Sequence, residues 1–125
     1  MVVNTLLGVG MQTIAEALAL GSKLGLPHHL LFDTLAKTAV VAPAHIGKLA
    51  SSERSDYTPQ FPIRLMEKDF ALILDEAGRL NLWMPTTEAA AGVNANETKS
   101  GHEEDFSAVV QHMEQAAAQE WKTWD

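Results

Sequence analysis

Asn4 is the polar residue of this chain whose type and setting most suggest chemistry. Asparagine is a poor helix former, yet Asn4 stands in an apolar stretch that begins at Val3 with helical spacing. Its amide could be held at a site where its oxygen and NH2 group fix the oxygen atoms of a substrate. It could equally be a residue at a fraying helix end. Composition does not separate these two interpretations.

Two charged clusters are further candidates. Lys68 and Asp69 are neighbours beside an apolar helical stripe; taken alone, they are a surface charge pair, which contributes little to stability. The acidic run 103–105 could bind a cation, but acids just before a helix satisfy its dipole and its free amides. Capping of the last helix, by Asp105 or Ser107, is therefore the favoured interpretation of this segment.

Neither a metal site nor a nucleotide-binding motif is indicated. His28 and His29 are neighbours and point in different directions on a helix, while the other histidines stand alone. Two-ligand helix sites prefer residues four apart with a third ligand nearby. The sequence has no cysteine, which excludes a disulfide scaffold, a thiol nucleophile and sulfur-rich zinc sites. It has no P-loop and no G-x-G-x-x-G after a strand.

The bulk composition is that of an ordinary globular domain. The 125 residues suffice for one domain with a core, and the net charge of −7 with only nine scattered basic residues argues against a nucleic-acid surface. No stretch approaches the roughly 18 uninterrupted apolar residues of a membrane helix, and the basic flank of a signal peptide is absent. We therefore expect neither a membrane nor a nucleic-acid partner, and a cytoplasmic location.

The elements that must position these residues are all predicted to be helices. Apolar residues at steps of three and four predict a long first helix from about residue 2 to Leu24. Gly25 is its expected left-handed C-cap and Pro27 blocks continuation. The glycines at positions 8 and 10 are best explained as sites of close helix packing. The fold class is therefore all-α, a bundle of about six helices.

Five further helices are predicted after the first. Pro62 precedes the fourth helix, which Asn81 stops, and Gly101 caps the fifth. The segment 51–60 is the longest loop, and the tail with Trp121 and Trp124 has no clear role. The predicted bounds are residues 30–37, from Pro43, from Pro62 to about residue 80, from Pro85 to about Lys99, and from Asp105 or Ser107 through Met113.

The first helix has no N-terminal cap. Its apolar pattern is already in phase at the first residues, and no Ser, Thr, Asp or Asn precedes it. We therefore expect the chain to be a piece of a longer protein.

Together these residues resemble the C-terminal helical domain of the β-hydroxyacid dehydrogenases, the 3-hydroxyisobutyrate dehydrogenase family. The stretches that carry the resemblance are MVVNTLLGVGMQTIAEALALGSKLGLP, FPIRLMEKDFAL and the loop GHEEDFSA before the last helix. Their order and spacing match across essentially the whole chain. The Lys-Asp pair and the EALAL run are moderately specific alone and much more specific in combination.

The resemblance implies roles for individual residues. In the family, the interdomain helix opens with a lysine that is the catalytic acid/base, and an asparagine that helps hold the substrate follows it by four residues. Asn4 matches this asparagine, so the lysine would lie one residue before Met1 and is absent from this chain. Phe61 matches an aromatic that borders the substrate pocket. Lys68, followed by Asp69, matches a second lysine that contacts the cofactor or the substrate.

For the parent protein, the resemblance implies hydride transfer between NAD or NADP and a small hydroxy acid. The family's N-terminal Rossmann domain is missing from residues 1–125, so we expect this chain alone to bind no cofactor and to be inactive. Family members dimerise through this domain, which makes a homodimer the expected assembly. The sequence does not choose between NAD and NADP, or among 3-hydroxyisobutyrate, tartronate semialdehyde and 4-hydroxybutyrate.

Two alternatives remain open at this stage. The chain could be a helical module without catalysis that only self-associates, or a domain of an imine-reductase-like enzyme with the same architecture and another proton donor. The residue four positions before Asn4 in the complete protein would discriminate them. A lysine there favours the hydroxyacid dehydrogenase.

Overall fold

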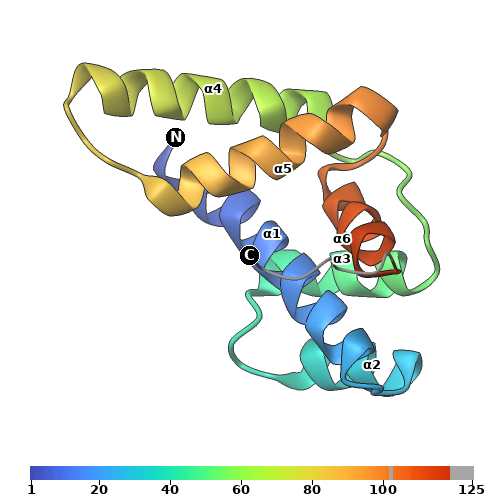
Figure 1. The fold of residues 1–125 in the computed structure, drawn as a ribbon. Coiled ribbons are helices and arrows are strands. Elements are labelled where there is room, and N and C mark those ends of the chain that lie inside the picture. Colours follow the sequence, from blue (N-terminus) through green and yellow to red (C-terminus); the bar gives the residue numbers. More distant parts are fainter. Residues whose placement is uncertain (102, 119–125) are drawn as a thin grey trace, which may run out of the picture.

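The computed structural model describes residues 1–101 and 103–118. This part of the chain contains six α-helices and one 3-10 turn, η1, and no strand, so the all-α prediction is confirmed. Figure 1 shows α4 and α5 packed side by side at one end, α2 and α3 together at the other, and α6 against the long α1. The elements are α1 (Val2–Lys23), α2 (His28–Lys37), α3 (Pro43–Glu53), α4 (Ile63–Arg79), α5 (Pro85–Gly101), η1 (Phe106–Ala108) and α6 (Val109–Ala118).

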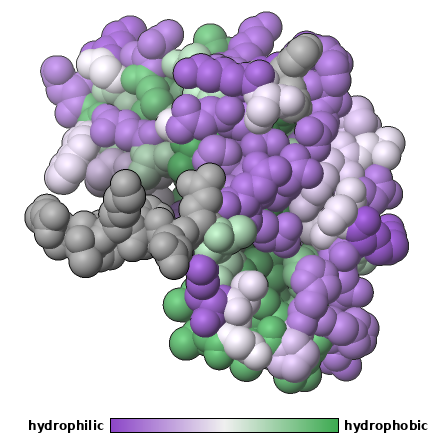
Figure 2. Space-filling view, turned by 45° about the vertical axis from the view of Figure 1, so that its right-hand side comes forward, coloured by the Kyte–Doolittle hydropathy of each residue, from purple (hydrophilic) through white to green (hydrophobic). Residues whose placement is uncertain are grey.

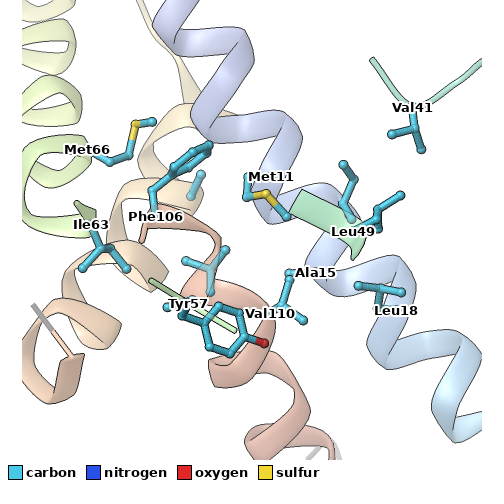
Figure 3. Packing of buried hydrophobic residues seen from close by; sticks show 14 of the residues in the cluster. Met11, Ala15, Leu18, Val41, Leu49, Tyr57, Ile63, Met66, Phe106 and Val110 are labelled. Carbon is cyan, nitrogen blue, oxygen red and sulfur yellow. The ribbon is translucent and has the colours of Figure 1, made fainter. Parts of the chain in front are cut away.

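The core lies where the inner face of α1 meets the other helices (Figure 3). Met11, Ala15 and Leu18 are one turn apart on α1 and are almost fully buried. They pack with residues from every later part of the described chain, including Leu49 of α3 and Val110 of α6. The apolar period of α1 is therefore the pattern that organises the bundle.

The helix ends confirm the predicted stop signals. After α1, Gly25 has a φ of +84°, and the amide of Leu26 donates to the carbonyl of Gly21 at 3.1 Å. After α4, Asn81 has a φ of +55°, and the amide of the next residue, Leu82, donates a hydrogen bond to the carbonyl of Ala77 within the helix. Both ends have the hydrogen bonds of a Schellman motif, in which a left-handed residue satisfies the last carbonyls.

Three predicted boundaries need correction. The second helix begins at His28 rather than residue 30, because the carbonyl of Pro27 already accepts the amide of Leu31 at 3.0 Å. The third helix extends to Glu53, three residues into the predicted loop. Gly101 is the last residue of α5 rather than a cap beyond it. Trp121 and Trp124 lie outside the described residues.

Helix α1 is the one described helix that could cross a membrane by length and composition, a test that core helices of soluble proteins also pass. Its exposed apolar side chains gather at its two ends, with Val2, Val3 and Leu6 at the start and Leu20 in the last turn, directly before the exposed C-cap residue Leu24. In Figure 2, hydrophobic surface lies at the lower end of the face shown, where α1 ends and α2 begins in Figure 1.

The packing role predicted for the glycines of α1 is confirmed. A Cβ at Gly8 would lie 2.5 Å from Cζ of Phe70 and 2.9 Å from Sδ of Met66, both on α4. A Cβ at Gly10 would lie 2.6 Å from Cε1 of His45 on α3. The absence of side chains at these two positions therefore allows α4 and the His45 ring to approach α1 closely.

Replacing Gly8 with alanine is expected to lower the free energy of unfolding by about 1–3 kcal/mol, the usual cost of overpacking a core. The matched control is Gly92→Ala in the exposed interior of α5, where an added Cβ meets nothing within 4 Å. This control should raise stability by about 0.5–1 kcal/mol through helix propensity. Urea denaturation of both variants measures the difference, and an unchanged or more stable Gly8→Ala protein would contradict the packing role.

Candidate functional site

Asn4 is held in place by a residue that is remote in sequence. Its Nδ2 donates a hydrogen bond of 2.8 Å to Oδ2 of Asp69, which joins the first turn of α1 to the middle of α4. Both side chains are half-buried. The NH2 group of Asn4 therefore faces Asp69, and its amide oxygen points away from it. Asn4 is therefore an oriented amide and not simply a fraying end.

The other two predicted site residues, Lys68 and Phe61, lie on α4 and just before it, close to Asp69 in the sequence. Lys68 is exposed on α4, directly before Asp69, and Phe61 is half-buried just ahead of that helix. In the described part of the chain, neither side chain is hydrogen-bonded to Asn4 or Asp69. The ring of Phe61 instead packs edge to face on Phe106, with centroids 5.9 Å apart.

The segment that carries Phe61 is fixed by Asp105, which is 1% exposed. Oδ1 of Asp105 accepts the backbone amides of Gln60 and Phe61, each at 3.0 Å. Oδ2 accepts the amide and the hydroxyl of Ser107 at 3.1 and 2.6 Å, and Nζ of Lys48 at 2.8 Å. The prediction that Asp105 caps the last helical segment is confirmed, but the same carboxylate also holds a distant loop.

Lys48 is the partner of this carboxylate that the sequence did not reveal. It lies on α3 with only 13% of its side chain exposed, its Nζ donates to Oε1 of Gln60 at 3.2 Å, and it sits 5.2 Å from the centroid of the Phe106 ring. Nothing in its immediate sequence distinguishes it from a surface lysine. Only the fold shows that it neutralises a buried anion.

The pKa of Asp105 reflects these contacts. Burial alone would raise it, but the hydrogen bonds from Lys48, from Ser107 and from the amides of Phe61 and Gln60 outweigh burial and hold it below the usual 3.8. The carboxylate is therefore ionised at neutral pH and gives the Phe61 segment a charged anchor.

His45 is a second residue that sequence reasoning missed. It is 5% exposed, and its Nε2 lies 2.9 Å from the carbonyl oxygen of Leu7, so the ring donates to α1 when this nitrogen carries the proton. His28 and His29 lie in the exposed first turn of α2, and both contact Glu53. Among the described residues, no three His, Asp or Glu side chains gather in a way that could hold a metal ion.

Residues 1–113 match the protein family described as "NAD-binding of NADP-dependent 3-hydroxyisobutyrate dehydrogenase". The chain belongs to this family. The six-helix structure fits the C-terminal domain of its members, which confirms the resemblance found in the sequence. Members of the family are NAD(P)-dependent hydroxyacid dehydrogenases and related reductases.

The relatives are much longer than this chain. Cytokine-like nuclear factor N-PAC of Drosophila melanogaster is 29% identical over 110 residues, which are 88% of this chain and 18% of that protein. The chloroplastic glyoxylate/succinic semialdehyde reductase 2 of Arabidopsis thaliana is 31% identical over 121 residues, 96% of this chain and 34% of the reductase. The crystal structure of 3-hydroxyisobutyrate dehydrogenase from Salmonella typhimurium superposes with a TM-score of 0.82 at 27% identity, over 89% of this chain and 39% of that one.

Replacing Asp105 with asparagine is expected to lower the free energy of unfolding by about 3–5 kcal/mol, because Lys48 is left buried without its anion. Since the folded-state pKa of Asp105 lies below the usual 3.8, its stabilisation is present above that pH and is lost as the pH falls further. Chemical denaturation between neutral and strongly acidic pH should show this loss in the wild type and not in the variant.

The control for this experiment is Asp33→Asn. Asp33 forms an ion pair of similar length, 2.9 Å, with Lys37, but on the exposed surface of α2. We expect little change in stability for this variant. An Asp105→Asn protein as stable as the Asp33→Asn protein would contradict the anchoring role of Asp105.

Proposed function

We propose that this chain is the substrate-binding helical domain of an NAD(P)-dependent dehydrogenase that acts on a small β-hydroxy acid. The observation that carries the proposal is the hydrogen bond between Asn4 and Asp69, which orients the amide that the family uses to hold substrate. Family membership supports the class of reaction.

In this mechanism, the chain's own residues bind and orient the substrate. With its NH2 group committed to Asp69, Asn4 presents its amide oxygen as an acceptor, which suits a substrate hydroxyl group. Phe61, fixed through Asp105, supplies an apolar wall for the pocket. NAD or NADP supplies the hydride acceptor when bound. The exposed ammonium group of Lys68 could contact the negative charge of this cofactor.

The proton of the hydroxyl group is transferred, on this proposal, by the lysine that the family places one residue before Met1. General-base catalysis contributes about 10²–10⁴-fold, so a chain without this lysine lacks a major part of the rate enhancement. A dinucleotide-binding Rossmann domain is the second component we propose. The chain covers only 34% of the plant reductase, and Val2, Val3 and Leu6 expose apolar surface where such a domain would join.

The proposal is tested by restoring the missing parts. We expect the 125-residue chain alone to give no turnover of 3-hydroxyisobutyrate or L-threonate with NAD or NADP. We expect activity when it is fused to the dinucleotide-binding domain of the Escherichia coli L-threonate dehydrogenase, a 28% identical relative, with the lysine four positions before Asn4. In this fusion, Asn4→Ala should lower kcat/KM by about 10²-fold through misplaced substrate.

Asn96→Ala is the matched control, because Asn96 is an exposed asparagine on α5. The fusion with this substitution should keep its activity. Two results would count against the proposal: turnover by the isolated chain above a heat-killed sample, and full activity of the Asn4→Ala fusion. A folded but inactive fusion would favour the non-catalytic interaction module.

Self-association through this domain is also part of the proposal. It is supported by the apolar side chains exposed at the junction of α1 and α2, which are Leu20, Leu24, Leu26 and Leu30. Sedimentation of the purified chain at micromolar concentration should give a dimer. A monomer under these conditions would contradict a homodimer built by this domain.

A further inference from the structure

Glu97 is a buried carboxylate between α5 and α6 that the proposed function does not use. It is 1% exposed. Its Oε1 accepts a hydrogen bond of 3.4 Å from Nε2 of Gln111, and its Oε2 lies 3.3 Å from Nδ1 of His112. Both partners are consecutive residues of α6, so this one side chain makes a polar attachment of α6 to α5.

The charges around Glu97 leave it a single cationic partner. Glu104, on the segment before η1, has the same sign and opposes its ionisation, while His112 favours it. Tyr57 lies on the loop before α4. Burial raises the pKa of its hydroxyl, and the negative charges of Glu114, Glu104 and Glu97 raise it further. Among the groups of the described chain that act on this carboxylate, only His112 can carry a positive charge.

Because Glu97 is buried, the charge state of Glu97 and His112 affects how stably α6 packs against α5. A buried carboxylate without a cation or a proton is costly. Burial and the charge of Glu104 raise the pKa of Glu97 above the usual 4.5, so its carboxyl group retains a proton to higher pH than an exposed glutamate. Histidine is the side chain that ordinarily changes charge between about pH 5 and 8. One proton held by the pair therefore offsets the free-energy cost of burying the carboxylate. On Glu97 the proton makes the carboxyl group neutral, and on His112 it supplies a cation.

We propose that Glu97 and His112 form a proton-linked latch that holds α6 against α5 and weakens when the pair loses its proton. The direction follows from linkage. A group that binds its proton more tightly in the folded state stabilises that state at low pH, and this stabilisation is lost as the pH rises. Loss of the proton leaves Glu97 as a buried anion that faces a neutral imidazole and the like charge of Glu104.

The latch predicts a pH-dependent opening confined to α6. Hydrogen exchange of the backbone amides of Val109–Ala118, corrected for the intrinsic exchange rate, should be followed from about pH 5 to pH 8. In the wild type, the opening equilibrium of α6 should rise by up to about tenfold per pH unit where the proton is lost. The amides of α4 serve as the internal reference and should not follow this change.

Three variants separate the latch from general packing. Glu97→Gln has no charge to neutralise and should abolish the pH dependence of α6 opening. His112→Gln leaves Glu97 as the one group of the pair that can hold the proton, so opening of α6 should begin at lower pH than in the wild type. His29→Gln is the matched control, because His29 also lies 3.3 Å from a glutamate oxygen but has 82% of its side chain exposed. It should behave as the wild type does.

Two results would overturn the proposal. One is wild-type exchange of α6 that does not change with pH relative to α4, and the other is a Glu97→Gln or His112→Gln protein that keeps the wild-type dependence. If Glu97→Gln does not fold, His112→Gln decides, because the side chain of His112 is 30% exposed and tolerates replacement more easily.

Discussion

The buried carboxylate of Asp105 is the constraint on which the second half of this structure depends. Removal of a carboxylate from water is costly, and five hydrogen-bond donors from three separate parts of the chain meet that cost. In doing so they fix the end of the loop before α4, the start of η1 and the middle of α3 relative to one another. The position of Phe61, and hence one wall of the proposed pocket, follows from this arrangement.

The other half of the candidate site depends on how closely two helices approach. Asn4 and Gly8 are one turn apart on α1, and they face the consecutive residues Asp69 and Phe70 of α4. Asparagine has a short side chain, so it can reach a carboxylate on a neighbouring helix only where the backbones are close. The missing side chain at Gly8 permits that approach, and the oriented amide is its result.

The sequence predicted the helices and their stop signals well, because both are local. Each of these signals depends on residues within one or two turns of the chain. They are the apolar period of α1, the left-handed residues Gly25 and Asn81, and the cap at Asp105. What could not be predicted is the pairing of charges between distant segments. Lys48 and Glu97 appear as ordinary surface residues until the fold buries them, and the reach of Asn4 to Asp69 depends on the crossing of α1 and α4.

The pairing of α1 with α6 has a consequence for how the chain is made. The first helix packs extensively against the last described one, so the apolar face of α1 leaves the ribosome long before its partner exists. Contacts between segments that are far apart in a chain form late, since the intervening loop must first be closed. During synthesis, the part of the apolar face of α1 that α6 covers is therefore buried late, and exposed apolar surface makes a nascent chain prone to aggregation and to binding by chaperones.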